Sequence, residues 1–575
     1  MTSLHSQVND NTPVLVGCSQ YLDKKGPEGL NYLDILTVSC KEAIKDCEAK
    51  TSLKEHLDAI SVIRFVGDTP NRDSATTALW GYSNMPRSLS NSLGVSVPYE
   101  IYTTTGGNSP QLVLNEICNR IKDGQINCAL LSGGEALDTF VSRVKIGKEV
   151  SWGDDPGGEP ETIGSSRDLG SESEQKHGLF DPSAVYPLFA NSIRANEGKS
   201  PKEHMEDIGQ MFSRFSEIAS KNEYAWFKIH RSSEEIVQVS PENRMVGFPY
   251  TKYMNAIMRV NQSAALVITS AKKARELGIP ESKWIFMHGG GCLNDIWNVT
   301  ERVDLHASPA IRKCSEAIFD LANCSQDEIS FFDLYSCFPS AVQVAKKEIG
   351  IPDNDDRDLT VTGGLPYFGG PGSAYVVNSM AAMMVKLRAN QGQFGMVTAN
   401  GWFLTKHGAG VFSSSPFLGE WNQVVDSSML QDEINSKEHV QFIEEANGKA
   451  TIETYTVVNS REGPEKAIII GRLENGKRFV ANTNKEENLL NKMMQKEMLN
   501  TKGTVKFENS KNINVLQIVD CVAYATRKHK RENSGNSKYT QKWRKYFNLI
   551  EPKFRHIAGQ YKGIEIKIFP QIKLD

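Results

Sequence analysis

One pattern occurs twice in the sequence, and this duplication constrains the fold more than any other feature. In each copy, a glycine-rich loop leads into an amphipathic helix, a Gly-Gln turn and a buried strand that ends in small residues. The first copy spans 103–135 and the second spans 361–403. Two α/β segments in the same order predict a duplicated fold in which loops from both halves meet at one site. The alternative is that the two glycine-rich loops resemble each other by coincidence.

The region from about residue 12 to 415 alternates short apolar runs with longer amphipathic stretches, which is typical of an α/β fold. Segments 14–17 and 128–131 are predicted to be buried strands, and apolar spacing over 111–122 predicts a helix. Residues 145–180 are rich in Gly, Asp, Glu, Ser and Pro, which indicates inserted loops.

We therefore expect a first half at 12–285, with a loop insertion at about 140–250, and a second half at 286–420. After them the sequence changes character, because strand-like runs at 450–458 and 467–473 dominate, and the latter runs into a turn signal, Glu-Asn-Gly-Lys. This predicts an additional β-rich, OB-like domain at 430–520.

The net charge of -4 conceals a basic tail, since residues 526–575 carry 13 Lys and Arg against 4 Asp and Glu. Basic residues interleaved with Trp543, Tyr546 and Phe547 allow binding to nucleic acid or to an anionic surface. A solvated appendage is the simpler interpretation and the one that we favour, so a nucleic-acid partner is not expected.

Composition excludes several other classes of protein. With 39% hydrophobic and 23% charged residues, the chain is neither a disordered nor a membrane protein in composition, and no apolar run approaches the roughly 18 residues of a spanning helix. The N-terminus has no secretory signal pattern, so we expect a cytoplasmic protein. Ten cysteines occur without a Cys-x-x-Cys pair, which argues against a structural metal site.

The glycine-rich loops carry the first chemical signal. Such a loop lets backbone N–H groups approach a ligand closely, and the following helix N-terminus stabilises an anion or oxyanion. Neither copy is a nucleotide phosphate loop, because no Gly-Lys-Ser/Thr follows, and the glycine run at 289–291 lacks dinucleotide-binding spacing.

Several of these segments resemble the thiolase superfamily. They are the duplicated halves, the stretch from Asp123-Gly124-Gln125 to Ser132-Gly133-Gly134-Glu135, and segment 261–267 running into 271–278. The resemblance covers about residues 12–417. It is strongest to the sterol-carrier-protein-like thiolases and to thiolase-like proteins with an additional C-terminal domain. It implies an α/β fold of two βαβαβαββ halves in a layered sandwich, plus the small C-terminal β domain.

The resemblance also implies a chemistry, namely the condensation or cleavage of acyl-CoA thioesters, with a CoA thioester as substrate and no permanently bound cofactor. Members of the family use a cysteine nucleophile at a helix N-terminus, a Gly-His-Pro histidine and a second cysteine. In this sequence the nucleophile position falls on Gly107, followed by Asn108 and Ser109, and Gly370 replaces the histidine. The loop of the second cysteine becomes Asn400-Gly401.

Two groups are candidates to replace the missing ones. Cys337, in a motif that the family places at the active site, is a candidate thiol, and His407 is a candidate base. Asn400 is a candidate oxyanion donor. The alternatives are a buried structural thiol for Cys337 and a hydrogen-bonded loop histidine for His407. Ser109 would need a base to act as a nucleophile.

We therefore expect a thiolase-superfamily, acyltransferase-like enzyme that binds acyl-CoA thioesters and performs altered or weak C-acyl transfer, without a metal. The alternative is a non-catalytic carrier or scaffold for acyl-CoA or lipid, which needs only the binding cleft. Both a monomer and a homodimer are compatible with the sequence.

Overall fold

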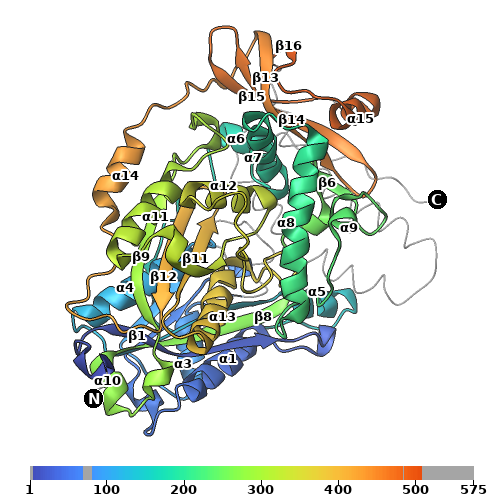
Figure 1. Ribbon diagram of the computed structural model, residues 1–575. Coiled ribbons are helices and arrows are strands. Elements are labelled where there is room, and N and C mark those ends of the chain that lie inside the picture. The colour runs from blue at the N-terminus through green and yellow to red at the C-terminus, as the bar shows by residue number, and fades with distance from the viewer. Residues whose placement is uncertain (1–3, 69–80, 484, 508–575) are drawn as a thin grey trace, which may run out of the picture. The chain divides into compact units, whose positions relative to one another are not determined.

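The computed structural model describes residues 4–68, 81–483 and 485–507, which belong to one structural unit (Figure 1). The predicted basic tail at 526–575 and the end of the predicted β domain, 508–520, lie outside the described residues.

The first half is built on a sheet with the strand order β1-β8-β4-β2-β3-β5. Its strands are β1 (Pro13–Leu22), β2 (Ala59–Val62), β3 (Tyr99–Thr103), β4 (Cys128–Ala136), β5 (Glu161–Ile163) and β8 (Asn261–Ser270). β2 runs parallel to β4, whereas β8 is antiparallel to both β4 and β1. The predicted strands 14–17 and 128–131 lie in β1 and β4.

The second half repeats this arrangement in a sheet with the order β10-β11-β12-β9. Its strands are β9 (Phe286–Asn294), β10 (Ile329–Asp333), β11 (Phe394–Gly401) and β12 (Lys406–Ser413). β10 is parallel to β11, and β12 is antiparallel to β11 and β9, the same sequence of pairings as β2-β4-β8-β1. The sequence repeat therefore reflects a duplicated fold rather than a coincidence.

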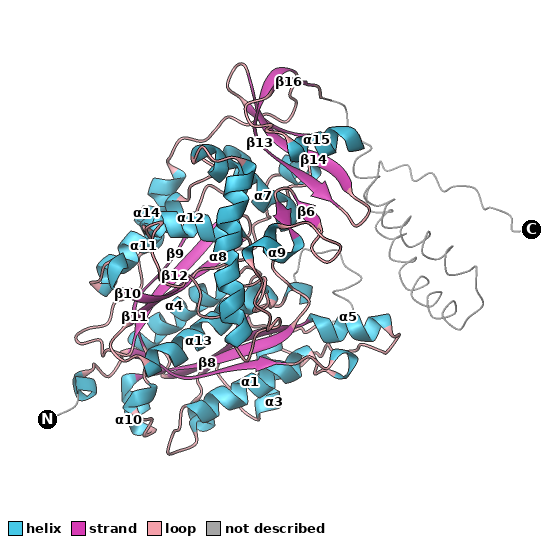
Figure 2. Ribbon diagram, turned by 45° about the vertical axis from the view of Figure 1, so that its right-hand side comes forward, coloured by secondary structure: helices cyan, strands magenta, loops and turns pink. Residues whose placement is uncertain are grey.

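Two helices lie between the sheets and form the centre of the layered structure (Figures 1 and 2). They are α4 (Ser109–Lys122), predicted as 111–122, and α13 (Tyr375–Ala389), and each contacts strands of both sheets. α4 can occupy this position because little of it faces solvent: the apolar Val113, Leu114, Ile117 and Ile121 are fully buried on one face, and the polar Gln111 and Asn115 are buried on another.

Outer helices cover the far faces of the two sheets. On the first sheet they are α1 (Tyr32–Asp46), α3 (Met85–Leu93) and α10 (Ala271–Glu276). α11 (Pro309–Ala322) covers the second sheet and packs against α12 (Pro339–Ile349). The fold is thus a layered α/β thiolase-like sandwich, as predicted.

The predicted insertion between β4 and β8 contains helices and short strands as well as loops. Its elements are α5 (Leu137–Lys145), β5, α6 (Glu172–Lys176), α7 (Pro182–Asn196), α8 (Pro201–Lys221), α9 (Ser233–Val237), β6 (Met245–Gly247) and β7 (Tyr250–Thr251). α7 matters most for the site, because it packs against α12 of the second half.

The C-terminal region forms an antiparallel sheet, as its sequence predicts. Its elements are β13 (Gly448–Asn459), β14 (Pro464–Leu473), β15 (Arg478–Asn482), α15 (Glu487–Gln495) and β16 (Lys502–Val505), which follow α14 (Ser427–Asn435). The predicted hairpin is β14–β15. β13 also pairs with β6 of the insertion, and the buried Arg478 donates to the carbonyl of Thr300 at 3.0 Å. The added domain is therefore joined to the core through the insertion and through a buried arginine.

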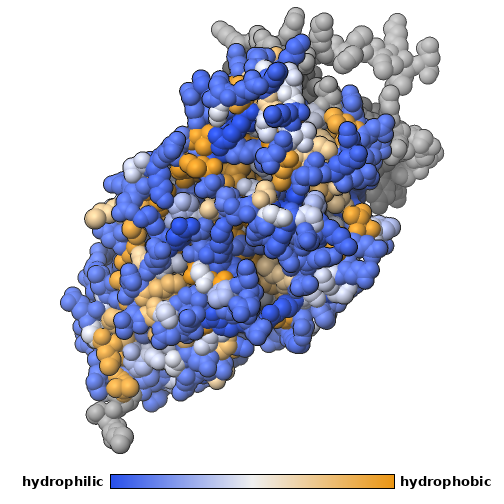
Figure 3. Space-filling view, turned by 45° about the horizontal axis from the view of Figure 1, so that its top comes forward, coloured by the Kyte–Doolittle hydropathy of each residue, from blue (hydrophilic) through white to orange (hydrophobic). Residues whose placement is uncertain are grey.

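The surface of the described unit is mostly polar. Figure 3 shows a face on which hydrophilic residues predominate and apolar side chains gather in small groups. Within residues 4–68, 81–483 and 485–507, no helix combines the length and apolarity needed to cross a bilayer.

The outer edge of β3 is covered by β5 from the same chain. β5 pairs in parallel with β3, and Glu161 of β5 receives two hydrogen bonds from Arg120 of α4, at 2.9 and 2.5 Å. An uncovered strand edge is a template for pairing with another chain, and here the edge strand is β5, which is only three residues long and offers little for such pairing.

We predict that Glu161→Lys, which places two like charges together, loosens β5 and produces concentration-dependent self-association, whereas the unaltered protein stays monomeric. Size-exclusion chromatography with light scattering measures this. Glu116→Lys is the matched control, because Glu116 also pairs with Arg120 but holds no strand. A Glu161→Lys protein that stays monomeric at every concentration, while hydrogen exchange at β3 increases, would contradict the account.

Candidate functional site

Loops from both halves meet at the N-terminus of α4, as the duplicated sequence predicts. The backbone N–H of Gly106 donates to the hydroxyl of Ser373 in the second glycine-rich loop, at 3.0 Å. Lys406, at the start of β12, donates through Nζ to the carbonyl of Thr105 at 3.0 Å. The two repeats therefore build one shared site.

Gly107, which stands where the family has its nucleophile, has no room for a side chain. A Cβ added there would lie 2.4 Å from the carbonyl oxygen of Asn400 and 2.4 Å from the hydroxyl of Tyr335. Tyr335 is held in place by its backbone N–H, which donates to Thr398 Oγ1 at 2.8 Å. The space of the missing cysteine is therefore filled by a tyrosine and a backbone carbonyl.

Gly370, at the expected histidine position, is less confined. Its N–H donates to the carbonyl of Ile257 at 2.9 Å, and an added Cβ would first meet Leu365 at 3.3 Å. The histidine is thus absent by sequence rather than excluded by packing.

The two residues after Gly107 differ in their hydrogen bonding. Ser109 is buried and donates through its hydroxyl to the carbonyl of Thr104 at 2.9 Å, so the structure shows no base beside it. Asn108 is 6% exposed, and its Oδ1 has no hydrogen-bond partner among the described residues. Unsatisfied buried acceptors are uncommon and point to a function or an absent ligand.

Asn400 and Cys337 lie together, and Tyr186 of the insertion joins them. Asn400 Nδ2 donates to the Tyr186 hydroxyl at 2.8 Å and lies 3.9 Å from Cys337 Sγ. Tyr186 donates in turn to the carbonyl of Trp402 at 2.8 Å, and its ring stacks on Phe338 with the centroids 4.4 Å apart. Tyr186 is not a site residue that the sequence predicts, because its role depends on how α7 folds back onto the second half.

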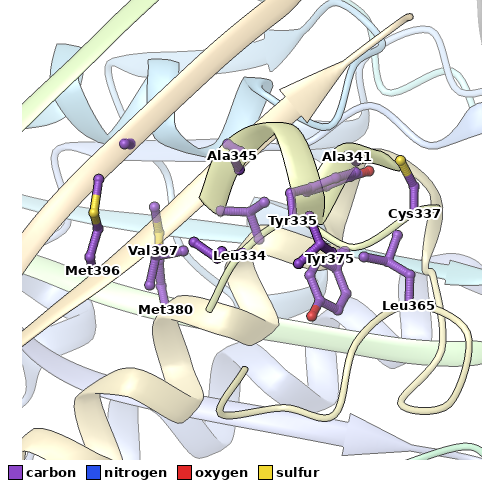
Figure 4. Close-up of a cluster of buried hydrophobic side chains, with 14 of the residues drawn as sticks. Leu334, Tyr335, Cys337, Ala341, Ala345, Leu365, Tyr375, Met380, Met396 and Val397 are labelled. Carbon is purple, nitrogen blue, oxygen red and sulfur yellow. The ribbon is translucent and has the colours of Figure 1, made fainter. Parts of the chain in front are cut away.

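Cys337 is a buried thiol in an apolar setting. Figure 4 shows it in a hydrophobic cluster to which the segment after β10, α12, α13 and β11 contribute, with Tyr335 and Ala341 near it. Burial raises the pKa of Cys337 to about 12, although hydrogen bonding with Tyr186 acts in the opposite direction. The thiol is therefore protonated at neutral pH, and a protonated thiol is a poor nucleophile.

His407 is held by an acidic residue of the second half. Its Nε2 lies 3.1 Å from Asp295 Oδ2 and 3.4 Å from Ser308 Oγ. Burial opposes ionisation of Asp295, but hydrogen bonds from His407 and Ser308 outweigh it and lower the pKa of that carboxyl. Asp295 and Ser308 both contact the same ring nitrogen of His407, and the Ser308 side chain also caps the N-terminus of α11. In a serine-protease triad the serine and the acid contact different ring nitrogens, so His407, Asp295 and Ser308 do not form such a triad.

The structure does not join His407 to Cys337 by a hydrogen bond within the described ranges. His407 and Asn400 are directly paired across β11 and β12 and share one face of the sheet, where both line a small cavity beneath α11 and α12. The other cavity-lining residues are Ile311, Cys314, Ser315, Tyr335, Ala341, Ala345, Thr398, Ala399, Leu404, Gly408 and Ala409. The cavity is thus largely apolar, with an amide and an imidazole among its few polar groups.

Lys406 points to the opposite face, toward α4, and is not among the site residues that the sequence predicts. The side chain is 3% exposed, and burial lowers the pKa of its amine to about 8. In the sequence, the one signal for Lys406 is that it precedes His407. In the structure, it follows the β11–β12 turn, in which Trp402 and Leu404 have positive φ values of 58° and 50°. Side chains as large as these seldom adopt this conformation, and such strain gathers at functional sites.

No group of three or more metal-ligating side chains converges in the part of the chain that the structure describes.

Comparisons with known proteins agree with this fold. A family model described as the thiolase-like protein type 1 additional C-terminal domain matches residues 429–510. A monomeric SCP2-thiolase-like protein type 1 from Mycobacterium smegmatis is similar, with 31% identity, a TM-score of 0.74, and coverage of 87% of this chain and 98% of that chain. A comparison with curated protein sequences finds no match.

Two more distant structures share the fold alone. The dimeric peroxisomal thiolase of Saccharomyces cerevisiae is 14% identical over 72% of this chain and 100% of that chain, with a TM-score of 0.50. An Ltp2–ChsH2(DUF35) aldolase is 14% identical over 70% of this chain and 98% of that chain, with a TM-score of 0.51.

We predict that Gly107→Ala lowers the free energy of unfolding by roughly 2–3 kcal/mol, because the added methyl meets a backbone carbonyl that cannot move freely. Gly370→Ala is the matched control and should cost less than about 1 kcal/mol, since its nearest contact is the end of a leucine side chain. Thermal and urea unfolding measure both changes. Equal costs for the two variants would show that the Gly107 position is not filled as described.

Proposed function

The chain belongs to the SCP2-thiolase-like proteins of type 1, and we propose on that basis that it binds an acyl-CoA thioester and acts on it without forming an acyl-cysteine at the usual loop. The observation that carries the proposal is a largely apolar cavity with Asn400 and His407 in its wall, which is also lined by Tyr335, the residue whose hydroxyl fills the space beside Gly107. At the usual nucleophile position, Gly107 has no side chain, and its neighbours leave no room for one.

The candidate roles follow from the chemistry of each group. Asn400 Nδ2 is a donor that can bind the thioester oxygen, where negative charge develops when the α-carbon loses a proton. His407 is the base that takes this proton, and its contact with Asp295 stabilises the imidazolium that forms. Cys337, which is protonated and hydrogen-bonded to Asn400, is suited to position that amide rather than to accept an acyl group.

The filled nucleophile position supports altered chemistry. Ordinary thiolase turnover needs a thiolate, and here the position lies against Tyr335 and the Asn400 carbonyl. Acyl transfer would therefore pass directly between two bound partners, or the enzyme would exchange only the α-proton. Both reactions use the thioester itself, so no resident cofactor is needed in this proposal.

A non-catalytic acyl-CoA carrier is the second candidate. The observation that favours it is the separation of His407 and Cys337 into two hydrogen-bonded groups, one with Asp295 and Ser308 and the other with Tyr186 and Asn400. In this case the cavity would bind the acyl group and no proton would move. In both proposals the protein is a cytoplasmic monomer.

Calorimetric titration with acetoacetyl-CoA, followed by chromatography of acetoacetyl-CoA plus CoA and of longer 3-ketoacyl esters, tests the proposal. We expect binding, and slow turnover that falls about 100-fold in His407→Gln and in Asn400→Leu, as for a lost base or oxyanion donor. Cys337→Ala should lower turnover while leaving the dissociation constant within about threefold.

Cys324→Ala and His439→Ala are the matched controls, because both side chains lie outside the cavity and remain partly exposed. Binding without turnover of any ester would support the carrier instead. Absence of binding would overturn both proposals.

A further inference from the structure

Lys406 is a buried amine that the proposed mechanism does not use. It sits at the junction of the two halves, with its Nζ 3.0 Å from the Thr105 carbonyl and 4.4 Å from the centroid of the Trp402 ring. Among the described residues no carboxylate forms an ion pair with it, although a buried lysine ordinarily has one.

The surroundings of Lys406 do not favour a charged amine. The side chain is directed at the loop that begins α4, and the N-terminus of a helix carries a partial positive charge. The groups facing the amine are Thr105 and Asn108 from this loop and Trp402 from the β11–β12 turn, and none of them titrates near neutral pH. A neutral amine is the form that this position accommodates best.

Asn108 supplies the second, independent observation. Its unpartnered Oδ1 and the Nζ of Lys406 both lie 2.7 Å from the position that a Cβ would take on Gly106. Gly106 thus lets a nucleophilic nitrogen and a free hydrogen-bond acceptor converge on one point. The helix does not use the Asn108 side chain as a cap, so the acceptor is free for a ligand.

We propose that Lys406 is a carbonyl-reactive amine that forms an imine with a ketone or aldehyde carbon of the ligand. The nitrogen lone pair attacks the carbonyl carbon, and one nitrogen proton moves to the carbonyl oxygen, which becomes the hydroxyl of a carbinolamine. Asn108 Oδ1 accepts a hydrogen bond from this hydroxyl and orients it. The carbon–oxygen bond then breaks as the carbon–nitrogen double bond forms, and the oxygen takes the second nitrogen proton and leaves as water. Hydrolysis returns the amine and the carbonyl compound, so no other reactant is consumed.

The Lys406 amine and the Asn108 side-chain oxygen together favour a carbonyl ligand over an anion. A carboxylate or phosphate placed beside Lys406 would face the Asn108 carbonyl oxygen, and two acceptors repel each other. A carbinolamine instead offers the donor that Asn108 lacks. The pKa of about 8 agrees with this chemistry, because about half of the amines are neutral at pH 8 and the fraction rises as the pH increases.

Reductive trapping tests the inference on the full-length protein. The protein is incubated with sodium cyanoborohydride and either acetoacetyl-CoA or ethyl acetoacetate, and the modified peptides are quantified by mass spectrometry between pH 6 and 10. We expect Lys406 to be modified on the order of 100-fold faster than exposed Lys202 at pH 8, because a pKa of about 8 leaves roughly half of the Lys406 amine neutral and reactive. The midpoint of the pH profile should lie near 8.

Two variants make the result specific. Lys406→Arg keeps the positive charge but removes the reactive amine, so its peptide should stay unmodified. Asn108→Asp places a carboxylate beside the amine and should move the midpoint upward by more than about one pH unit. Circular dichroism verifies that both variants are folded.

Modification of Lys406 no faster than Lys202 by ethyl acetoacetate, in folded protein, would overturn the inference. The experiment with acetoacetyl-CoA rests on the proposed function, whereas the experiment with ethyl acetoacetate does not. Failure of acetoacetyl-CoA to bind, with Lys406 still trapped by the ester, would therefore reject the acyl-CoA proposal and leave the reactive lysine standing.

Discussion

The packing of α4 between two sheets is the constraint on which the rest of the structure depends. A helix that is buried against strands of both halves cannot shift without opening the core, so the loop that begins it is fixed against the second half. Gly106 and Gly107 are where backbone, rather than side chains, must meet the other half. The site exists because the two repeats share this helix layer.

That same packing explains how the fold is kept although Gly107 stands at the position of the family's nucleophile. Tyr335 fills the volume beside Gly107 and belongs to the core of the second half. Polar groups are displaced to two faces of the β11–β12 hairpin, with Asn400 and His407 on one face and Lys406 on the other. Side chains alternate between the two faces of a strand, so the positions of Asn400, His407 and Lys406 along β11 and β12 determine which of them face the same ligand.

The sequence predicts the fold better than the site, for physical reasons. The glycine-rich loops and the helix at 111–122 are local patterns that the duplicated core reproduces, and the hairpin after 467–473 is one that the C-terminal sheet reproduces. The absence of the nucleophile at Gly107 is equally local. Tyr186 and Asp295 act through folding of distant segments onto β11 and β12, and no spacing in the sequence encodes those contacts. The sequence does not predict Lys406 as a site residue, because its lowered pKa arises from burial, which the residue type alone does not reveal.

The most direct test of the central claim is intact-protein mass spectrometry of the complex with acetyl-CoA, quenched in acid within seconds of mixing. The account predicts bound thioester by calorimetry and no acetyl group on any cysteine, because Gly107 offers no nucleophile and the Cys337 thiol is protonated. An acetyl group on Cys337 that disappears when CoA is added would contradict it, and would show that ping-pong thiolase chemistry persists at a relocated cysteine.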